Sequence, residues 1–196
     1  MTLRFQNASF ADLPQQVLGF WFGSPDAAGS FAERPEWFRT DPAFDAACAN
    51  RFAVACREAI EGRLNALAET ADGALALILL LDQLPRNVYR GTRMAYAGDT
   101  ASREIARVAL ARRYDNARPA VQRLFFYLPF EHSESVADQE RACWLIAQLG
   151  NPTWLNYAEQ HRDVIRRFGR FPQRNRALGR PSTAEELAFL AAASGF

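Results

Sequence analysis

Apolar residues recur at spacings of three and four along most of this chain. Residues 41–62 show the pattern most clearly, because Phe44, Cys48 and Phe52 form one stripe. Asp41 and the proline after it suit an N-cap and a first helical position. A period near 3.6 residues is typical of an amphipathic α-helix and not of a strand. A chain built this way has to bury the apolar faces of its helices against one another.

The same spacing and the same end signals predict helices in the rest of the chain. The apolar run 74–81 fits a buried strand or a buried helix by periodicity alone, and its leucine and alanine content favours a helix. One helix is expected to end before Pro129, and Ser182 with Glu185 forms a capping box. Helices are expected over 13–23, 41–62, 73–85, 99–113, 118–130, 135–150, 153–169 and 182–195. No β-hairpin signal is found, so we predict one all-α domain, residues 1–196, of about eight helices stacked as antiparallel hairpins.

Composition limits the chemistry and the location of the protein. All 23 basic residues are arginine and the formal net charge is +1, which excludes lysine Schiff-base chemistry and gives no overall field toward nucleic acid or membranes. Cys48 and Cys56 would lie about 12 Å apart on one helix, too far for a disulfide. Reduced thiols, no signal-peptide apolar region and no apolar run long enough for a bilayer predict a cytoplasmic protein. The four tryptophans, Trp144 among them, are expected in the core.

Two stretches repeat one residue order. "LDQLPRNVYRGT" (81–92) and "FGRFPQRNRALGRPST" (168–183) each contain a proline, an Arg-Asn pair, a glycine and a threonine. Both suit turns at helix ends, where asparagine caps backbone groups and glycine adopts a positive φ. They also concentrate arginines, such as Arg86 and Arg174, whose guanidinium groups would form a forked anion site if the two turns converged. The pattern therefore allows a purely structural function or a binding function.

Ionisable residues elsewhere are further candidates for chemistry. Glu131, His132 and Glu134 precede a helix, where carboxylates interact favourably with the helix dipole, and a Glu/His pair is also able to perform general acid–base catalysis. No strong metal-ligand spacing is present. His161 falls on the apolar face of its helix, as a core histidine or as one that faces a pocket. Asp82 ends the buried run and requires a partner, which we expect to be an arginine.

Five longer motifs together resemble one known family. They are "VLGFWFG", "LILLLDQLPRNVYRGT", "FFYLPFEHSESVADQ", "HRDVIRRFGRFPQRN" and "LGRPSTAEELAFL", in this order, from about residue 14 to 192. They resemble the bacterial domain of unknown function family 924. The resemblance implies an all-α, TPR-like fold with a right-handed superhelical array of helices. It implies no activity, because the family is named for lacking one.

Three functions stay open on the sequence. The first is the binding of an anionic small molecule or an acidic peptide group in an arginine-rich cleft. The expected ligand-binding residues are Asp82, Gln83, Arg86, Asn87, Arg90, His132, Gln139, His161, Arg170, Arg174 and Asn175. The second is a small hydrolase or lyase with Glu131, His132 or Glu134 as acid or base. The third is a scaffold whose polar network only specifies the fold. No metal, cofactor, nucleic-acid or membrane partner is expected, and the oligomeric state stays open.

Overall fold

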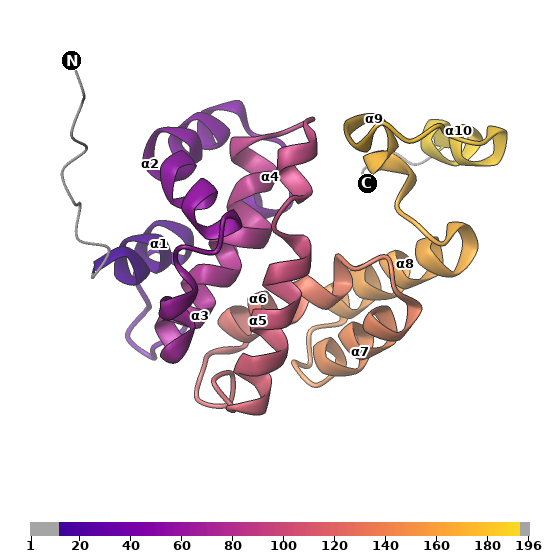
Figure 1. The fold of residues 1–196 in the computed structure, drawn as a ribbon. Helices are drawn as coiled ribbons and strands as arrows, with labels where there is room; N and C mark the ends of the chain where they lie inside the picture. Colours follow the sequence, from indigo (N-terminus) through magenta and orange to yellow (C-terminus); the bar gives the residue numbers. More distant parts are fainter. Residues whose placement is uncertain (1–11, 193–196) are drawn as a thin grey trace, which may run out of the picture.

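A computed structural model describes residues 12–192, and every regular element in that part of the chain is helical, which confirms the all-α prediction. Helices and short helical turns follow one another with brief connections, as Figure 1 shows. The helices are α1 (Leu13–Phe22), α2 (Pro42–Ile60), α3 (Ala71–Ile78), α4 (Leu84–Val88), α5 (Asp99–Ala111), α6 (Ala120–Glu131), α7 (Val136–Ala147), α8 (Pro152–Phe168), α9 (Asn175–Leu178) and α10 (Ala184–Ala192).

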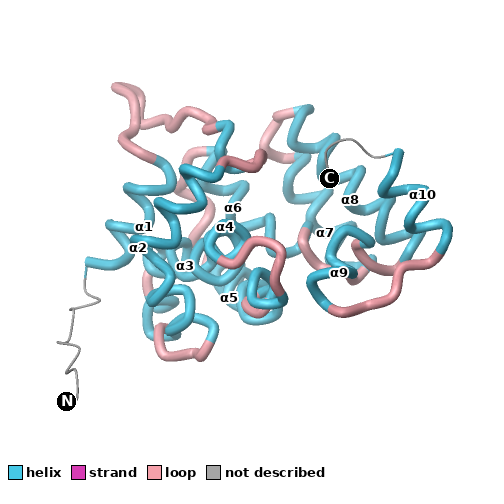
Figure 2. The backbone as a smooth tube through the Cα atoms, turned by 90° about the horizontal axis from the view of Figure 1, so that it is seen from above, coloured by secondary structure: helices cyan, strands magenta, loops and turns pink. Residues whose placement is uncertain are grey.

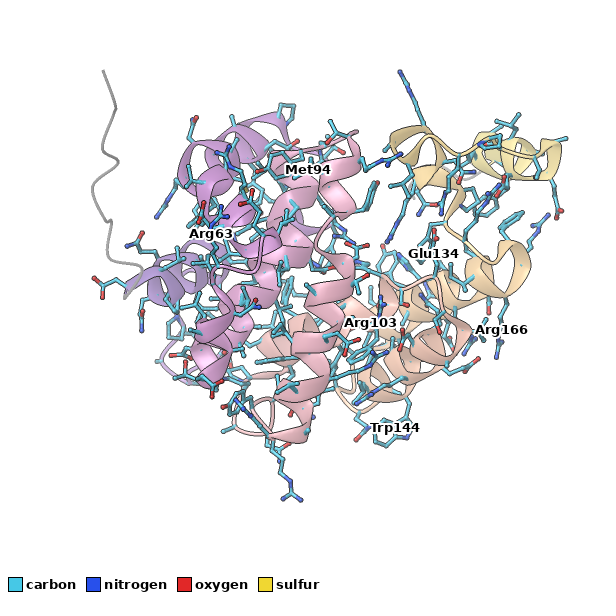
Figure 3. All side chains as sticks on the ribbon, in the orientation of Figure 1. Arg63, Met94, Arg103, Glu134, Trp144 and Arg166 are labelled. Atoms are coloured by element: carbon cyan, nitrogen blue, oxygen red, sulfur yellow. The ribbon has the colours of Figure 1, made fainter. Side chains whose placement is uncertain are left out.

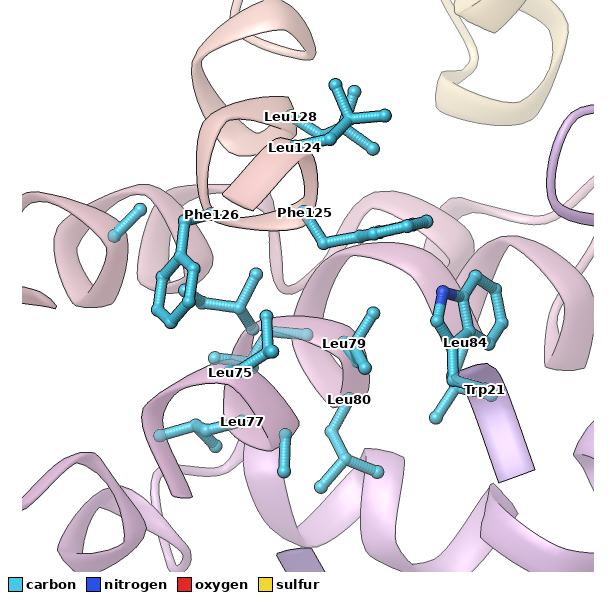
Figure 4. Close-up of a cluster of buried hydrophobic side chains, with 14 of the residues drawn as sticks. Trp21, Leu75, Leu77, Leu79, Leu80, Leu84, Leu124, Phe125, Phe126 and Leu128 are labelled. Carbon is cyan, nitrogen blue, oxygen red and sulfur yellow. The ribbon is translucent and has the colours of Figure 1, made fainter. Parts of the chain in front are cut away.

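The centre of the molecule is the apolar run 74–81, whose periodicity alone fits either a strand or a helix. It is helical: α3 continues through a π-helical turn, Leu79–Gln83, into α4. Every residue from Ala74 to Gln83 is buried. Figure 4 shows leucines of this run beside Phe125 and Phe126 of α6 and near Trp21 of α1. The run therefore serves as the core around which the other helices pack.

The helices pack in two ways around that core. α1 and α2 both contact the continuous helix formed by α3 and α4, whereas α5, α6 and α7 each pack against the next helix in the chain. Figure 2, seen from above, shows the first group on one side and α7 and α8 on the other. Packing of successive helices agrees with the expected stack of hairpins, and the right-handed TPR-like superhelix stays a prediction.

The C-terminal segment, residues 169–192, projects from the end of α8. Figures 1 and 2 show α9 and α10 together, at the side of the molecule opposite to α1. Its apolar contacts form a second small core, in which Val164, Ile165 and Phe171 pack with Phe168 and Phe189. This second core is separate from the main one, so polar contacts have to contribute much of the attachment.

Three details of the sequence prediction are wrong. Helix α6 continues through Pro129 to Glu131 rather than ending before the proline. The capping box of α10 lies one residue later than predicted: Thr183 N–H donates to Glu186, and Glu186 N–H donates to the hydroxyl of Thr183. Trp144 is 66% exposed and projects from the outer side of α7 (Figure 3). The buried face of α7 is the one that carries Ala142, Leu145 and Ile146. Trp144 lies on another face of this helix, so its indole is exposed.

The cysteine and membrane expectations can also be compared with the structure. All three thiols are buried and none is in a disulfide, as the helical spacing of Cys48 and Cys56 predicted. None of the helices in residues 12–192 is both long and apolar enough to cross a membrane.

Candidate functional site

A break in helical regularity places Asp82 and Gln83. Pro85 has no N–H to donate to the carbonyl of Leu81, four residues earlier. The chain instead forms a π-turn, in which Leu84 N–H donates to Leu79 O, five residues back. Gly98 packs directly against the carbonyl of Leu81, where any side chain would overlap it. This approach brings the start of α5 beside the π-turn, and π-turns are frequent at functional sites.

Seven ionisable side chains meet at this point, and we name them the central cluster. They come from the π-turn, α4, α5, the end of α6, α8 and the turn before α9. Its members are Asp82, Arg86, Asp99, Glu131, His132, His161 and Arg174. The two turns that carry the Arg-Asn pairs, 85–87 and 172–175, therefore do come together, next to the Glu-His segment at the end of α6.

Asp82 is fully buried and has several partners. Its carboxylate lies 2.8 Å from His132 Nδ1 and 3.2 Å from an Arg86 nitrogen, and it accepts a hydrogen bond of 2.5 Å from Gln83. Burial on its own would raise the pKa of Asp82, but the charge of Arg86 and the hydrogen bonds of His132 and Gln83 lower it. Asp82 is therefore a carboxylate at neutral pH. The expectation that an arginine would partner it is confirmed.

One carboxylate joins the two turns. Asp99, the first residue of α5, accepts from Arg86 at 3.1 and 3.3 Å and from Arg174 at 2.8 Å. Arg174 also donates to the backbone carbonyl of His132 at 3.0 Å. Its guanidinium lies 4.8 Å from the ring centre of Tyr96 and 4.5 Å from that of Phe171. Both arginines are thus held in one position by paired charges and aromatic faces.

Glu131 and His161 form the other side of the central cluster. The Glu131 carboxyl lies 3.4 Å from His161 Nδ1, and the His161 and His132 ring centres are 6.3 Å apart. Burial, with the charge of Asp82 nearby, raises the pKa of Glu131 to about 8. Burial and the neighbouring His132 lower the pKa of His161 to about 4. At pH 7 the acid of this pair holds a proton and the imidazole is neutral.

His132 has the geometry of an oriented base. Burial lowers its pKa, although Asp82 opposes that effect, so the ring is neutral at pH 7. A neutral ring beside a carboxylate donates from Nδ1 and leaves the lone pair on Nε2. Nε2 makes no hydrogen bond with any other residue in the described range, and the His132 side chain is 15% exposed. Within that range no group of three metal-ligating side chains is found. An imidazole that a carboxylate orients in this way is able to transfer protons.

Several residues expected at the same site lie elsewhere. Asn87 and Arg90 both bind Asp45 of α2, at 2.8 Å and at 2.6 and 2.7 Å. Arg170 and Asn175 instead bind Glu186 of α10. The two asparagines of the repeated motif thus connect their turns to different helices.

Two further candidates stabilise the turn after α6. Gln139 donates to the carbonyls of Glu131 and Ser133 at 2.5 and 2.7 Å. Glu134 accepts from Phe171 N–H at 2.8 Å and from Arg180 at 2.7 and 2.9 Å. Glu134 is on the side of the turn that faces the C-terminal segment (Figure 3). Both carboxylate oxygens of Glu134 accept hydrogen bonds from groups that hold the structure together. These contacts favour a structural function for Glu134 over that of a catalytic acid.

Sequence analysis missed Asp99, Tyr96 and Phe171. Asp99 was predicted only as the start of a helix, and the two aromatic residues gave no signal. A hint was available in Gly98, because a glycine immediately before an acidic helix start is consistent with close approach of two backbones. Which backbone approaches it depends on the fold and not on local pattern.

Comparison with known proteins gives a family but no activity. A family model described as "Bacterial protein of unknown function (DUF924)" matches residues 17–194. The chain is similar to a solved structure of a protein of unknown function, ATU0120, from Agrobacterium tumefaciens. The two are 43% identical, with 94% of this chain and 99% of that chain covered and a TM-score of 0.82. No curated protein matches the chain.

Proposed function

The chain belongs to the bacterial family of unknown function DUF924, and from its central cluster we propose that it is an acid–base enzyme acting on a small molecule, with His132 as the proton acceptor. The observation that carries the proposal is the 2.8 Å contact between His132 Nδ1 and the buried carboxylate of Asp82. Such a contact fixes the tautomer and leaves Nε2 as the base, as in other carboxylate–histidine pairs that transfer protons.

The neighbouring pair supplies the complementary acid. Glu131 keeps its proton up to about pH 8 because it is buried beside Asp82. Two groups whose surroundings push their protonation in opposite directions are typical of acid–base sites. His132 accepts a proton and Glu131 donates one, so a hydrolase or lyase reaction is the class that they fit.

The contacts of Arg86 and Arg174 favour a structural function for these arginines over the anion binding that the sequence predicted. Arg86 already binds Asp82 and Asp99, and Arg174 already binds Asp99 and the carbonyl of His132. Their positions support a role in holding Asp82 and His132 in place more than a role as free anion receptors. Binding of an anion by Arg86 therefore has less support than acid–base chemistry.

A screen with paired variants tests the proposal. Purified wild type and His132→Gln are compared on ester, amide, phosphoester and carbon–oxygen lyase substrates. The expected result is an activity that falls about 10²- to 10⁴-fold in His132→Gln, the usual loss when a general base is removed. Glu140→Gln is the control, since Glu140 is exposed and pairs only with Arg166, and it should keep the activity.

Chemical modification provides a second readout that needs no substrate. Diethyl pyrocarbonate reacts with neutral imidazole nitrogens, so the folded wild type should be modified at His132. If His132 is fully protected in the folded protein, or if any activity is equal in wild type and His132→Gln, the proposal is wrong.

The scaffold function is the alternative that one observation favours. Every arginine of the central cluster has a carboxylate partner, as a network that only specifies the fold would require. That function predicts that His132→Gln changes stability and nothing else.

A further inference from the structure

A hollow of about 500 Å³ lies away from the central cluster, between the loop after α1, the start of α3 and the connection from α5 to α6. The larger apolar side chains that line it are Pro25, Phe31, Tyr114 and Pro119. The polar side chains that line it include Arg113 and Arg118. A hollow of this size, with apolar side chains and few polar groups, is suited to a small molecule.

Arg113 has a backbone conformation that arginine seldom adopts. Its φ is +59°, and it is the one non-glycine residue with positive φ among residues 12–192. The left-handed region places Cβ too close to the backbone of an L-residue, so glycine is preferred there.

Two other helix ends in this chain make the same turn with glycine. At the end of α2, Gly62 N–H donates to Ala59 O and the next N–H donates to Glu58 O. At the end of α9, Gly179 N–H donates to Arg176 O and the next N–H donates to Asn175 O.

After α5 the pattern is the same, with Arg113 in the glycine position. Arg113 N–H donates to Leu110 O, and Tyr114 N–H donates to Ala109 O. This is the helix end for which glycine is the usual residue. Glycine would suit the backbone of this turn better, and the one structural gain from an arginine here is the favourable interaction of a cation with the helix C-terminus.

The other charged side chains around the hollow already have partners within the chain. Arg118 pairs with Asp72, and Arg112 pairs with Glu69. Asp115 accepts a hydrogen bond of 2.7 Å from Tyr127. The Arg113 guanidinium makes no hydrogen bond or ion pair with the rest of the described chain. One unpaired cation thus lines a hollow that also has apolar side chains.

We propose that this hollow binds a small molecule that carries a carboxylate or phosphate on an apolar ring, with Arg113 as the partner of the anionic group. Phe31, Tyr114 and the prolines contact the ring, and Arg113 forms charge-assisted hydrogen bonds with the anion. Asp99 and Arg113 are at opposite ends of α5, about 20 Å apart by helical rise. The site is therefore distinct from the central cluster and does not depend on the function proposed there.

The experiment uses the full chain and defined probes. Phenyl phosphate and benzoate combine both halves of the ligand, inorganic phosphate has only the anion, and phenol has only the ring. Binding is measured by titration calorimetry or by chemical shift changes. Wild type is expected to bind phenyl phosphate or benzoate more tightly than either half alone.

Variants separate a binding role of Arg113 from a structural one. Arg113→Gln and Arg113→Gly should each weaken the aryl anion by about 10- to 100-fold, the loss expected for one charge-assisted hydrogen bond. Arg113→Gly suits the positive φ, so it should keep or raise the melting temperature while affinity is lost. Arg176→Gln is the control, because Arg176 is exposed on α9 and the substitution removes the same charge.

Three results would overturn the proposal. The first is that wild type binds neither phenyl phosphate nor benzoate. The second is that Arg113→Gly binds these aryl anions as tightly as wild type does. The third is that phenol binds as tightly as phenyl phosphate, which would make the hollow an apolar site without an anion partner. Phe31→Ala tests the contact with the ring. This substitution should weaken the binding of phenyl phosphate and leave any binding of inorganic phosphate unchanged.

Discussion

Single residues in the central cluster show which parts of the site follow from chemistry alone. A carboxylate at the end of a buried run needs a cation, so the Asp82–Arg86 pair was predictable from the sequence. The contact of Asp82 with His132, fifty residues later, was not. Local pattern gives the requirement for a partner, whereas the fold decides which partner meets it.

Glu131 makes stability depend on pH in a defined range. The unfolded carboxyl has its pKa near 4.5, and burial raises the folded value to about 8. The folded state therefore binds more protons between these values, and stability falls as pH rises toward 8, by at most about 1.4 kcal/mol per pH unit. His161, with its pKa lowered to about 4, opposes this trend only below pH 6.5.

Glu131→Gln should abolish the fall between pH 6.5 and 8. The measurement is the free energy of unfolding in urea at several pH values, for wild type and for Glu131→Gln. Equal slopes in the two proteins across this window would show that Glu131 is already ionised in the folded state.

Asp99 connects two guanidinium groups, so its charge should matter more than that of an ordinary surface carboxylate. Asp99→Asn leaves Arg174, which is 8% exposed, without a carboxylate partner. Breaking a buried pair costs about 3 kcal/mol, and urea unfolding should show a loss of this size. Asp163→Asn is the control, because Asp163 is exposed and its pairs are worth less than about 1 kcal/mol. Similar losses for both variants would contradict the prediction.

At the scale of elements, helix positions were predictable and the departures from regular helix were not. Periodicity and caps located α1, α2, α5, α7 and α8 to within a few residues. The π-turn needs more than a local signal, because a proline at position 85 is equally compatible with a helix end, as we predicted. The helix continues past Pro85 into α4 because α4 packs against α2.

Gly98 should be essential to the junction between the π-turn and α5. Gly98→Ala places Cβ onto the carbonyl of Leu81, and because this atom belongs to the backbone of a buried helix, it is unable to move aside. We expect a loss of roughly 1–3 kcal/mol from overpacking. Gly19→Ala is the matched control: it lies inside α1 with no atom within 4 Å of the new methyl group, and it should gain about 0.5–1 kcal/mol. A neutral Gly98→Ala would show that the two segments can separate without cost.

At the scale of the whole molecule, contacts between distant segments determine the site, and a single sequence does not specify them. The repeated order of a proline, an Arg-Asn pair and a glycine suggested that two turns meet, and Arg86 and Arg174 do share Asp99. Yet the asparagines of the same motifs bind different helices. Similar local sequence therefore gives a similar turn, but the partner of each side chain depends on which helix the fold places beside it.

The C-terminal segment should open as a unit of its own, because its core is small and its attachment to the rest is polar. Glu134 is central to that attachment, with three hydrogen bonds from Phe171 and Arg180. Replacing Glu134 by glutamine removes the charge, and a charge-assisted hydrogen bond contributes about 1.5–3 kcal/mol. Amide protons in residues 170–190 should then exchange about 10- to 100-fold faster, while those of α3 and α6 keep their rates.

Hydrogen exchange read by mass spectrometry measures this directly, and Glu140→Gln, which loses an exposed pair with Arg166, is the control. A rise of the same size throughout the molecule would mean that the segment and the main core unfold together, and no faster exchange at all would mean that the apolar contacts of Phe171 are sufficient to hold the segment in place.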